Sequence, residues 1–135
     1  YSSVITKNKL IIIVCDNGGF AVINRLQLFK GGKEYNNLLK SSNTPGLVDV
    51  DFAKHAESMG AKSEHVNSIS DLEAAFKRAK ESDVTYVISI KTHAYKWVEG
   101  SAFWDSPTLE IPTTKENEEA LKLYKEGKGK QRQGV

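Results

Sequence analysis

The chain opens with a run of apolar positions that has no polar alternation. Residues 10–14 read Leu-Ile-Ile-Ile-Val, and such a run is typical of a strand buried on both faces in a parallel sheet. It breaks into Asp-Asn-Gly-Gly at residues 16–19. Open α/β sheets bind ligands at the carboxyl ends of their strands. We therefore expect this polar glycine turn to lie where a ligand would bind.

Apolar residues at helical spacing predict three helices in the next part of the chain. The first opens near Gly19 and ends at the Gly31-Gly32 pair. The second covers residues 51–59, with Gly60 as the residue that ends it. The third begins at a capping box formed by Ser70 and Glu73, in which the serine hydroxyl and the glutamate side chain cap the helix reciprocally.

Two further strands are predicted between and after these helices. Residues 61–66 form a weak candidate because Lys62, Glu64 and His65 interrupt the apolar pattern, whereas residues 84–90 are strongly strand-like. Strands separated by helices predict a three-layer α/β/α fold with a parallel sheet and right-handed crossovers. We expect the sheet to be truncated on its N-terminal side, and an open edge there would favour association.

The remaining segments are less regular. Residues 30–49 have no clear period and predict a long loop, which is uncommon in a compact domain unless it is functional or mobile. A capping box at Thr113 and Glu116 predicts a helix that ends before Gly127, and residues 125–133 are expected to be a frayed, charged tail. The pattern divides the chain into an α/β domain over residues 1–93 and an extension over residues 94–135. In that extension Trp97, Phe103 and Trp104 are interpreted as packing or interface anchors rather than stacking platforms.

Composition narrows the possible partners. The 135 residues are 39% hydrophobic and 27% charged with a net charge of +2, which predicts a globular domain and gives no electrostatic case for nucleic acid. No apolar stretch approaches the roughly 20 residues that span a bilayer, so no membrane partner is expected. The single Cys15 argues against a disulfide framework and favours the cytoplasm. His55, His65 and His93 lack metal-ligand spacing.

The glycine turn and its surroundings resemble a known enzyme family. Asn17-Gly18-Gly19-Phe20-Ala21, followed by Leu26-Gln27, is similar to the second half of the thiamine-diphosphate signature in the acetolactate synthase and pyruvate oxidase group. The Asp51-Phe52 helix that ends in Gly60 also matches that group's pattern, so the resemblance covers roughly residues 1–93. It implies the diphosphate-binding, C-terminal domain of such an enzyme.

This resemblance implies specific ligands. The side-chain oxygen of Asn17 and the main-chain carbonyl of Gly19 would bind Mg²⁺, and thiamine diphosphate would be the cofactor. The cofactor-binding residues implied are Asp16, Asn17, Gly18, Gly19, Phe20, Ala21 and Ile23. Asp16 departs from the family's Asn at a position that does not hold the metal, and the apolar Ile23 disfavours proton transfer from that position. The alternative is that Asp-Asn-Gly-Gly is only a tight turn, because these residues are the commonest in turns.

Among subfamilies the chain looks most like the trihydroxycyclohexanedione hydrolases of inositol catabolism, through Asp16-Asn17, Asn24, Gln27 and Trp104-Asp105-x-Pro107. That implies hydrolytic opening of a cyclic dione, a small-molecule substrate, and a homodimer or homotetramer. No Gly-Asp-Gly precedes Asp16 and the chain lacks an initiator Met. We therefore expect a C-terminal piece that works with the remainder of its polypeptide, binds cofactor poorly alone and lacks the catalytic glutamate.

Two other interpretations stay open. Another thiamine-diphosphate enzyme of the same group would use the same Asn17 site. A non-catalytic α/β module that binds a phosphorylated ligand or a protein partner would have the glycine turn as its only site. Asn24 and Gln27 could contact a polyol substrate, or they could lie on the solvated face of a short helix.

Overall fold

The computed structural model describes residues 1–43, 46, 49–98 and 108–132, and these form two compact units. The first unit comprises residues 1–17 and 46–93, and the second comprises residues 18–45 and 94–135. Phe103, Trp104, Asp105 and Pro107 lie outside the described residues. No helix in the described part of the chain is both long and apolar enough to cross a membrane.

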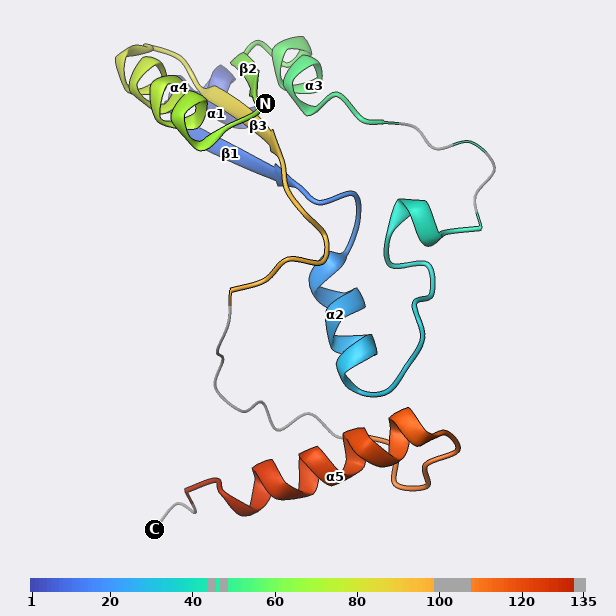
Figure 1. Ribbon diagram of the computed structural model, residues 1–135. Coiled ribbons are helices and arrows are strands. Elements are labelled where there is room, and N and C mark those ends of the chain that lie inside the picture. Colours follow the sequence, from blue (N-terminus) through green and yellow to red (C-terminus); the bar gives the residue numbers. More distant parts are fainter. Residues whose placement is uncertain (44–45, 47–48, 99–107, 133–135) are drawn as a thin grey trace. The chain divides into compact units, whose positions relative to one another are not determined.

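The first unit is a three-layer α/β structure, as the sequence predicts (Figure 1). Its elements in chain order are α1 (Ser2–Ile5), β1 (Ile11–Asp16), α3 (Phe52–Ser58), β2 (Lys62–Val66), α4 (Ile69–Glu81) and β3 (Tyr86–Lys91). The strands are parallel in the order β1-β3-β2. The ladder pairs Ile11 and Lys62 with Tyr86 on either side of β3, so all three carboxyl ends meet at one edge.

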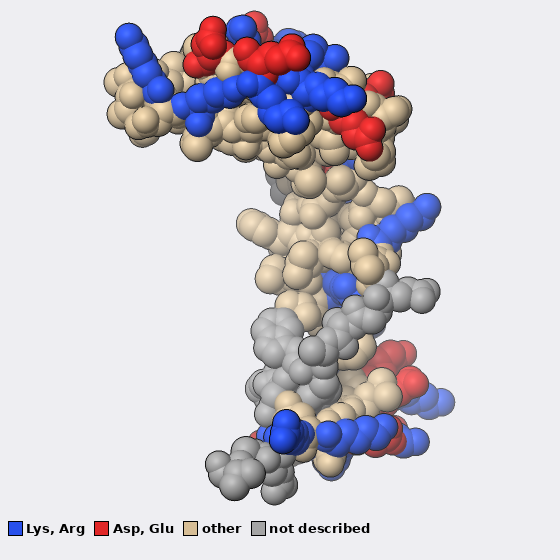
Figure 2. Space-filling model, turned by 90° about the vertical axis from the view of Figure 1, so that its left-hand side faces the viewer, with Lys and Arg blue, Asp and Glu red and all other residues tan. Residues whose placement is uncertain are grey.

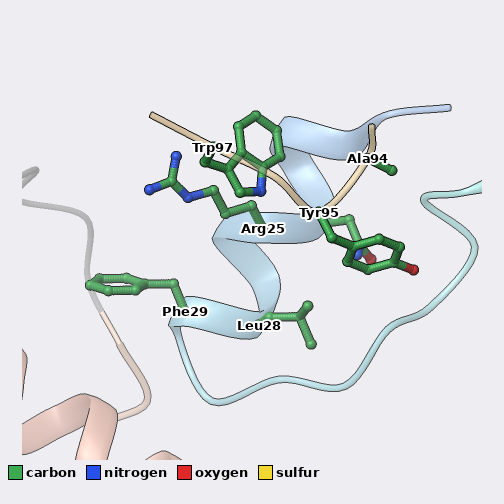
Figure 3. A pocket seen from close by; sticks show the side chains of 7 residues that line it. Arg25, Leu28, Phe29, Ala94, Tyr95 and Trp97 are labelled. Atoms are coloured by element: carbon green, nitrogen blue, oxygen red, sulfur yellow. The ribbon is translucent and has the colours of Figure 1, made fainter. Parts of the chain in front are cut away.

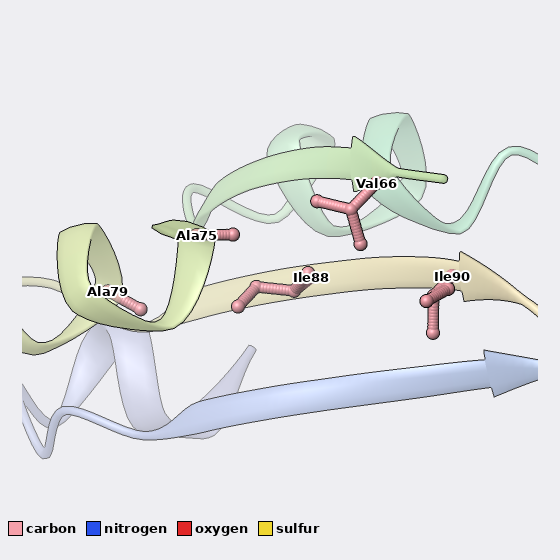
Figure 4. Close-up of a cluster of buried hydrophobic side chains, with 5 residues drawn as sticks. All are labelled: Val66, Ala75, Ala79, Ile88 and Ile90. Carbon is pink, nitrogen blue, oxygen red and sulfur yellow. The ribbon is translucent and has the colours of Figure 1, made fainter. Parts of the chain in front are cut away.

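Side chains of the central strand β3 alternate between two hydrophobic clusters. Ile88 and Ile90 pack with Val66 and with Ala75 and Ala79 of α4 on one face (Figure 4). On the opposite face, Val87 packs with Ala56, Ala61, Val4 and Val14. Successive side chains of a strand point to opposite faces, so α4 covers one face, and α1 and α3 cover the other.

The expectation that β1 is buried on both faces is wrong. Ile12 and Ile13 are 40% and 42% exposed. The cause is the position of β1 at the edge of the described sheet, where it pairs with β3 on one side only. A β-branched run alone therefore did not distinguish an edge strand from a central one.

Polar residues on β2 are explained by partners on neighbouring elements. Glu64 accepts two hydrogen bonds from the Arg78 guanidinium, at 3.1 and 2.6 Å, and one from the Tyr86 hydroxyl at 2.6 Å. These interactions, led by Arg78, lower the pKa of the Glu64 carboxyl. A bidentate pair of this kind fixes geometry, so Glu64 ties the edge strand β2 to α4 and β3.

Three helix boundaries differ from the sequence prediction. Helix α4 begins after Ser68, whose hydroxyl accepts the Asp71 N–H at 3.0 Å and donates to the Asp71 carboxylate, so the box at Ser70 is wrong. Both pairs satisfy the capping pattern, and the structure uses the earlier one. In the second unit Thr114 caps α5 (Lys115–Gly129) in place of Thr113. That helix also continues past Gly127, so the tail predicted from residue 125 is helical through Gly129.

The other elements of the second unit are α2 (Ala21–Phe29) and a 3₁₀ turn at Leu39–Ser41, which lies inside the predicted loop. The predicted end of α2 before the glycine pair is confirmed, and Gly31 has a left-handed φ of 79°. The Asn117 side chain of α5 donates to the Gly31 carbonyl at 2.8 Å. A Cβ on Gly31 would lie 2.6 Å from the Glu116 carbonyl oxygen, so glycine is required where α5 packs.

Charged side chains of both signs are mixed on the surface. On the face shown in Figure 2, Lys and Arg side chains lie beside Asp and Glu side chains rather than in a single basic patch. This distribution agrees with the small net charge of +2.

Asp51 predicts a measurable pH dependence of stability. Its carboxylate caps α3 by accepting the Lys54 N–H at 2.9 Å and also contacts Nε2 of His65 at 2.7 Å. These contacts, with the Lys54 N–H first, lower the pKa of Asp51 to about 2. A depressed folded-state pKa means that the stabilisation is complete above the ordinary pKa of about 4 and is lost as pH falls toward 2.

The test compares the wild-type chain with Asp51→Asn, because asparagine caps helices but does not titrate. Thermal unfolding from pH 6 to pH 2 should show a steeper loss of stability below pH 4 for the wild type. Parallel profiles for the two proteins would show that the Asp51 contacts contribute nothing in solution.

Candidate functional site

The glycine turn begins at the carboxyl end of β1, where an ion pair holds its first residue. Asp16 is the ladder partner of Lys91, and the Lys91 ammonium lies 2.6 Å from the Asp16 carboxylate. The same ammonium contacts Asp49, and the Asp16 carbonyl accepts the Thr92 N–H at 2.8 Å. The two carboxylates, Asp16 foremost, raise the pKa of Lys91. Asp16 is thus anchored to the central strand.

Asn17, the last residue of the first unit, is half-buried. Within the part of the chain that the structure describes, its side-chain amide makes no hydrogen bond. The Asn17 amide oxygen is therefore open to solvent or to a ligand.

The two glycines that follow adopt backbone conformations that other residues rarely adopt. Gly18 has φ 75° and Gly19 has φ 150°. We call residues 37–39 the strap, because their backbone lies against this turn. Asn37 accepts the Phe20 N–H at 2.7 Å, and Leu39 donates to the Gly18 carbonyl at 2.9 Å. A Cβ on Gly19 would lie 2.5 Å from the Asn37 carbonyl oxygen, so a side chain cannot fit there.

Helix α2 starts directly after the turn with uncapped amides. Phe20 is its N-cap residue and provides no side-chain hydrogen bond, and the Phe20 ring is exposed. Ala21 is buried as a whole residue, whereas Ile23 is exposed. First-turn N–H groups without a cap are available to an anion and carry the positive end of the helix dipole.

Sequence reasoning missed the residues that fix the turn. Lys91 reaches Asp16 only through the strand register, and Leu38 is placed by a backbone bridge to Gly19. Neither relationship has a local sequence signal. The interpretation of Asn24 as part of a solvated face is wrong: its side chain is buried and donates to Glu34 at 2.8 Å.

The second unit also contains an open recess of about 300 Å³ beside α2 (Figure 3). The Arg25 guanidinium lies over the Trp97 ring, 4.9 Å from its centroid, and Tyr95 donates to Glu34 at 2.6 Å. Among the residues that the structure describes, Oδ1 of Asn24 has no hydrogen-bond partner, but it has almost no accessible surface. A molecule in the recess would therefore not reach this atom, so we interpret the recess as packing around Trp97.

Comparisons with known proteins show which proteins the chain resembles. Three curated relatives carry the name 3D-(3,5/4)-trihydroxycyclohexane-1,2-dione hydrolase. They come from Lacticaseibacillus casei (34% identity), Bacillus licheniformis (33%) and Bacillus subtilis (32%), over 87%, 87% and 86% of this chain. The chain spans only 18% of the length of each. No solved structure matches the chain.

The family model described as "Thiamine pyrophosphate enzyme, C-terminal TPP binding domain" matches residues 2–90. This match includes β1, the glycine turn, α2, the sheet and its covering helices. The chain therefore belongs to the family of C-terminal, thiamine-pyrophosphate-binding domains of thiamine pyrophosphate enzymes.

Proposed function

We propose that this chain holds the diphosphate end of thiamine diphosphate together with Mg²⁺. The observation that carries this proposal is the oxygen left available at each end of the glycine turn: the Asn17 amide oxygen and the Gly19 carbonyl. Neither accepts a hydrogen bond within the described residues. Mg²⁺ takes about six oxygen ligands and usually shares them with phosphate and water.

The short distance along the chain between Asn17 and Gly19 supports the proposal that their two oxygens bind one cation. Asn17 and Gly19 are separated by a single residue, so their Cα atoms lie no more than about 7 Å apart. Both oxygens are uncharged ligands, so the positive charge of the cation remains available to balance the negative charge of the diphosphate. The uncapped amide of the exposed Ile23 in α2 supplies a further donor for phosphate oxygens.

The chain's own residues would position the cofactor, and we assign no proton transfer to any of them. The chemistry that thiamine diphosphate would supply when bound is stabilisation of a carbanion on the carbon of the carbonyl group that it attacks. Asp16, held by Lys91, fixes where the turn leaves the sheet. Gly18, Phe20 and Ile23 would contact the cofactor, with Ile23 offering an apolar surface.

We further propose that the parent protein is a hydrolase that opens trihydroxycyclohexane-1,2-dione at a carbon–carbon bond. The names of the relatives support this substrate class. In that proposal residues 1–93 and the extension 94–135 act with other parts of a longer, cytoplasmic homo-oligomer. Turnover of the cyclic dione but not of pyruvate by the full-length protein would separate this hydrolase from a carboligase or oxidase of the same family.

The metal site is tested by Asn17→Ala in the full-length protein. Loss of one oxygen ligand should weaken Mg²⁺-dependent retention of thiamine diphosphate by about tenfold or more, because changes even to the residues that support a metal's ligands cost about 10–100-fold in affinity. Equilibrium dialysis of the cofactor at varied Mg²⁺ measures this without reference to turnover.

Asn67→Ala is the matched control for this experiment. Asn67 follows β2 at the same carboxyl edge of the sheet, and its side chain is exposed. The same chemical change there should leave cofactor retention unaltered. Equal retention by the Asn17 and Asn67 variants would refute the proposed metal site.

A further inference from the structure

The strap determines which carbonyl of the glycine turn a ligand can reach. Gly19 and Leu38 form an antiparallel bridge, and the hydrogen bonds on either side of it run from Phe20 N–H to Asn37 and from Leu39 N–H to Gly18. This pattern makes Gly19 and Leu38 a non-hydrogen-bonded pair, in which neither residue bonds the other. The Gly18 carbonyl is consequently occupied, whereas the N–H and C=O of Gly19 face away from the strap.

Side-chain contacts hold the strap in this position. Leu38 is 2% exposed and is among the largest fully buried side chains of the described residues. Asn37 donates from Nδ2 to the Gln27 side chain, and Gln27 in turn donates to the Lys33 carbonyl. Burial of a leucine side chain stabilises the position of the segment that carries it. The strap is thus linked to α2 through the Asn37–Gln27 hydrogen bond, and the Leu38 side chain at its centre is buried.

We propose that Leu38 is a positioning residue for the cation: its burial holds the strap so that the Gly19 carbonyl, and not that of Gly18, is the main-chain ligand. This inference rests on the proposed function, in which the Gly19 carbonyl binds the cation. Without the Leu38 anchor the strap separates from the turn, the Gly18 carbonyl loses its partner, and the glycines sample conformations in which neither carbonyl is fixed.

Binding of Mn²⁺ to the full-length protein in the presence of thiamine diphosphate tests this role. Mn²⁺ prefers the same oxygen ligands as Mg²⁺, and the electron paramagnetic resonance signal of free Mn²⁺ gives its dissociation constant without any measurement of turnover. Leu38→Ala should raise that constant at least fivefold. Leu38→Met fills a similar volume, so its constant should stay within twofold of wild type.

The matched control is Asn117→Ala. Asn117 is buried in the same unit and donates to Gly31, away from the strap, so its loss loosens the unit without freeing the Gly18 carbonyl. We expect Mn²⁺ affinity to stay within twofold of wild type. Equal weakening by Leu38→Ala and Asn117→Ala would mean that Leu38 acts only through general stability, and the inference would be overturned.

The outcomes separate this inference from the proposed function. If the Asn17→Ala protein binds Mn²⁺ like the wild type, then the proposed metal site is refuted and, with it, the role of Leu38. Weak binding by Asn17→Ala together with unaltered binding by Leu38→Ala would leave the metal site standing and refute the positioning role alone.

Discussion

Replacement of Gly19 by alanine is expected to destabilise the second unit by about 3 kcal/mol. Two costs combine at this position. A φ of 150° belongs to a region that is essentially restricted to glycine, at about 1–3 kcal/mol for other residues. The added Cβ would also lie 2.5 Å from the Asn37 carbonyl oxygen and 2.9 Å from the Leu38 Cα. Both neighbours are backbone atoms, so rotation of a side chain cannot relieve the contact.

Gly18→Ala is the matched control, since Gly18 also has a positive φ but no atom within 4 Å of its ideal Cβ. Only the left-handed conformation is penalised there, by about 1 kcal/mol. Urea unfolding should rank the variants in that order, and hydrogen exchange at the Phe20 and Leu39 amides should accelerate mainly in Gly19→Ala. If the two variants are equally stable, then the close approach of the strap is incorrect.

Ile88→Ala should be the most damaging change in the first unit, with a loss of about 4 kcal/mol. Ile88 is 0% exposed on the central strand and packs against Val66, Ala75 and Ala79. Its neighbours include two alanines on α4, which are too small to fill the space that the lost atoms leave. Large-to-small changes at such sites cost about 2–5 kcal/mol, and the upper part of that range applies where the surroundings cannot collapse.

Ile12→Ala removes the same atoms from the edge strand and serves as the comparison. Ile12 is 40% exposed, so the loss should be about 1 kcal/mol. The shift in the urea midpoint at constant m-value measures both changes. A cost for Ile12→Ala that matches that of Ile88→Ala would show that the exposed face of β1 is covered in solution.

Local pattern was sufficient for most elements of the first unit, although it did not predict the short helix α1. Helical spacing placed α3 and α4, and β-branched runs placed β1 and β3, because burial of one face imposes a period on the sequence. The same pattern could not identify β1 as an edge strand, because exposure of Ile12 depends on which strands lie beside it. It also could not choose between Ser68 and Ser70 as the cap of α4, since both satisfy the capping pattern.

The residues of the candidate site also fall into two groups, those that could be named from the sequence and those that could not. Asn17 and Gly19 could be named from the sequence because their residue types and spacing match a known signature. Lys91 and Leu38 could not, because each meets the motif through a partner distant in the chain. Asp16 and Lys91 are 75 residues apart, and no local rule relates them. The motif thus identifies the residues that could bind a ligand, whereas the residues that hold them in place are known only from the fold.

The two ends of the glycine turn are secured by contacts of very different sequence separation. The strap meets Gly19 from a distance of about 20 residues, whereas the Asp16–Lys91 pair closes a segment of 75 residues. Loop-closure entropy rises by about 0.6 kcal/mol for each doubling of length, so the longer closure costs about 1.2 kcal/mol more. The kinetic consequence is an order of events: the turn and its strap can form early as a local structure, and the motif becomes complete only when the last strand docks.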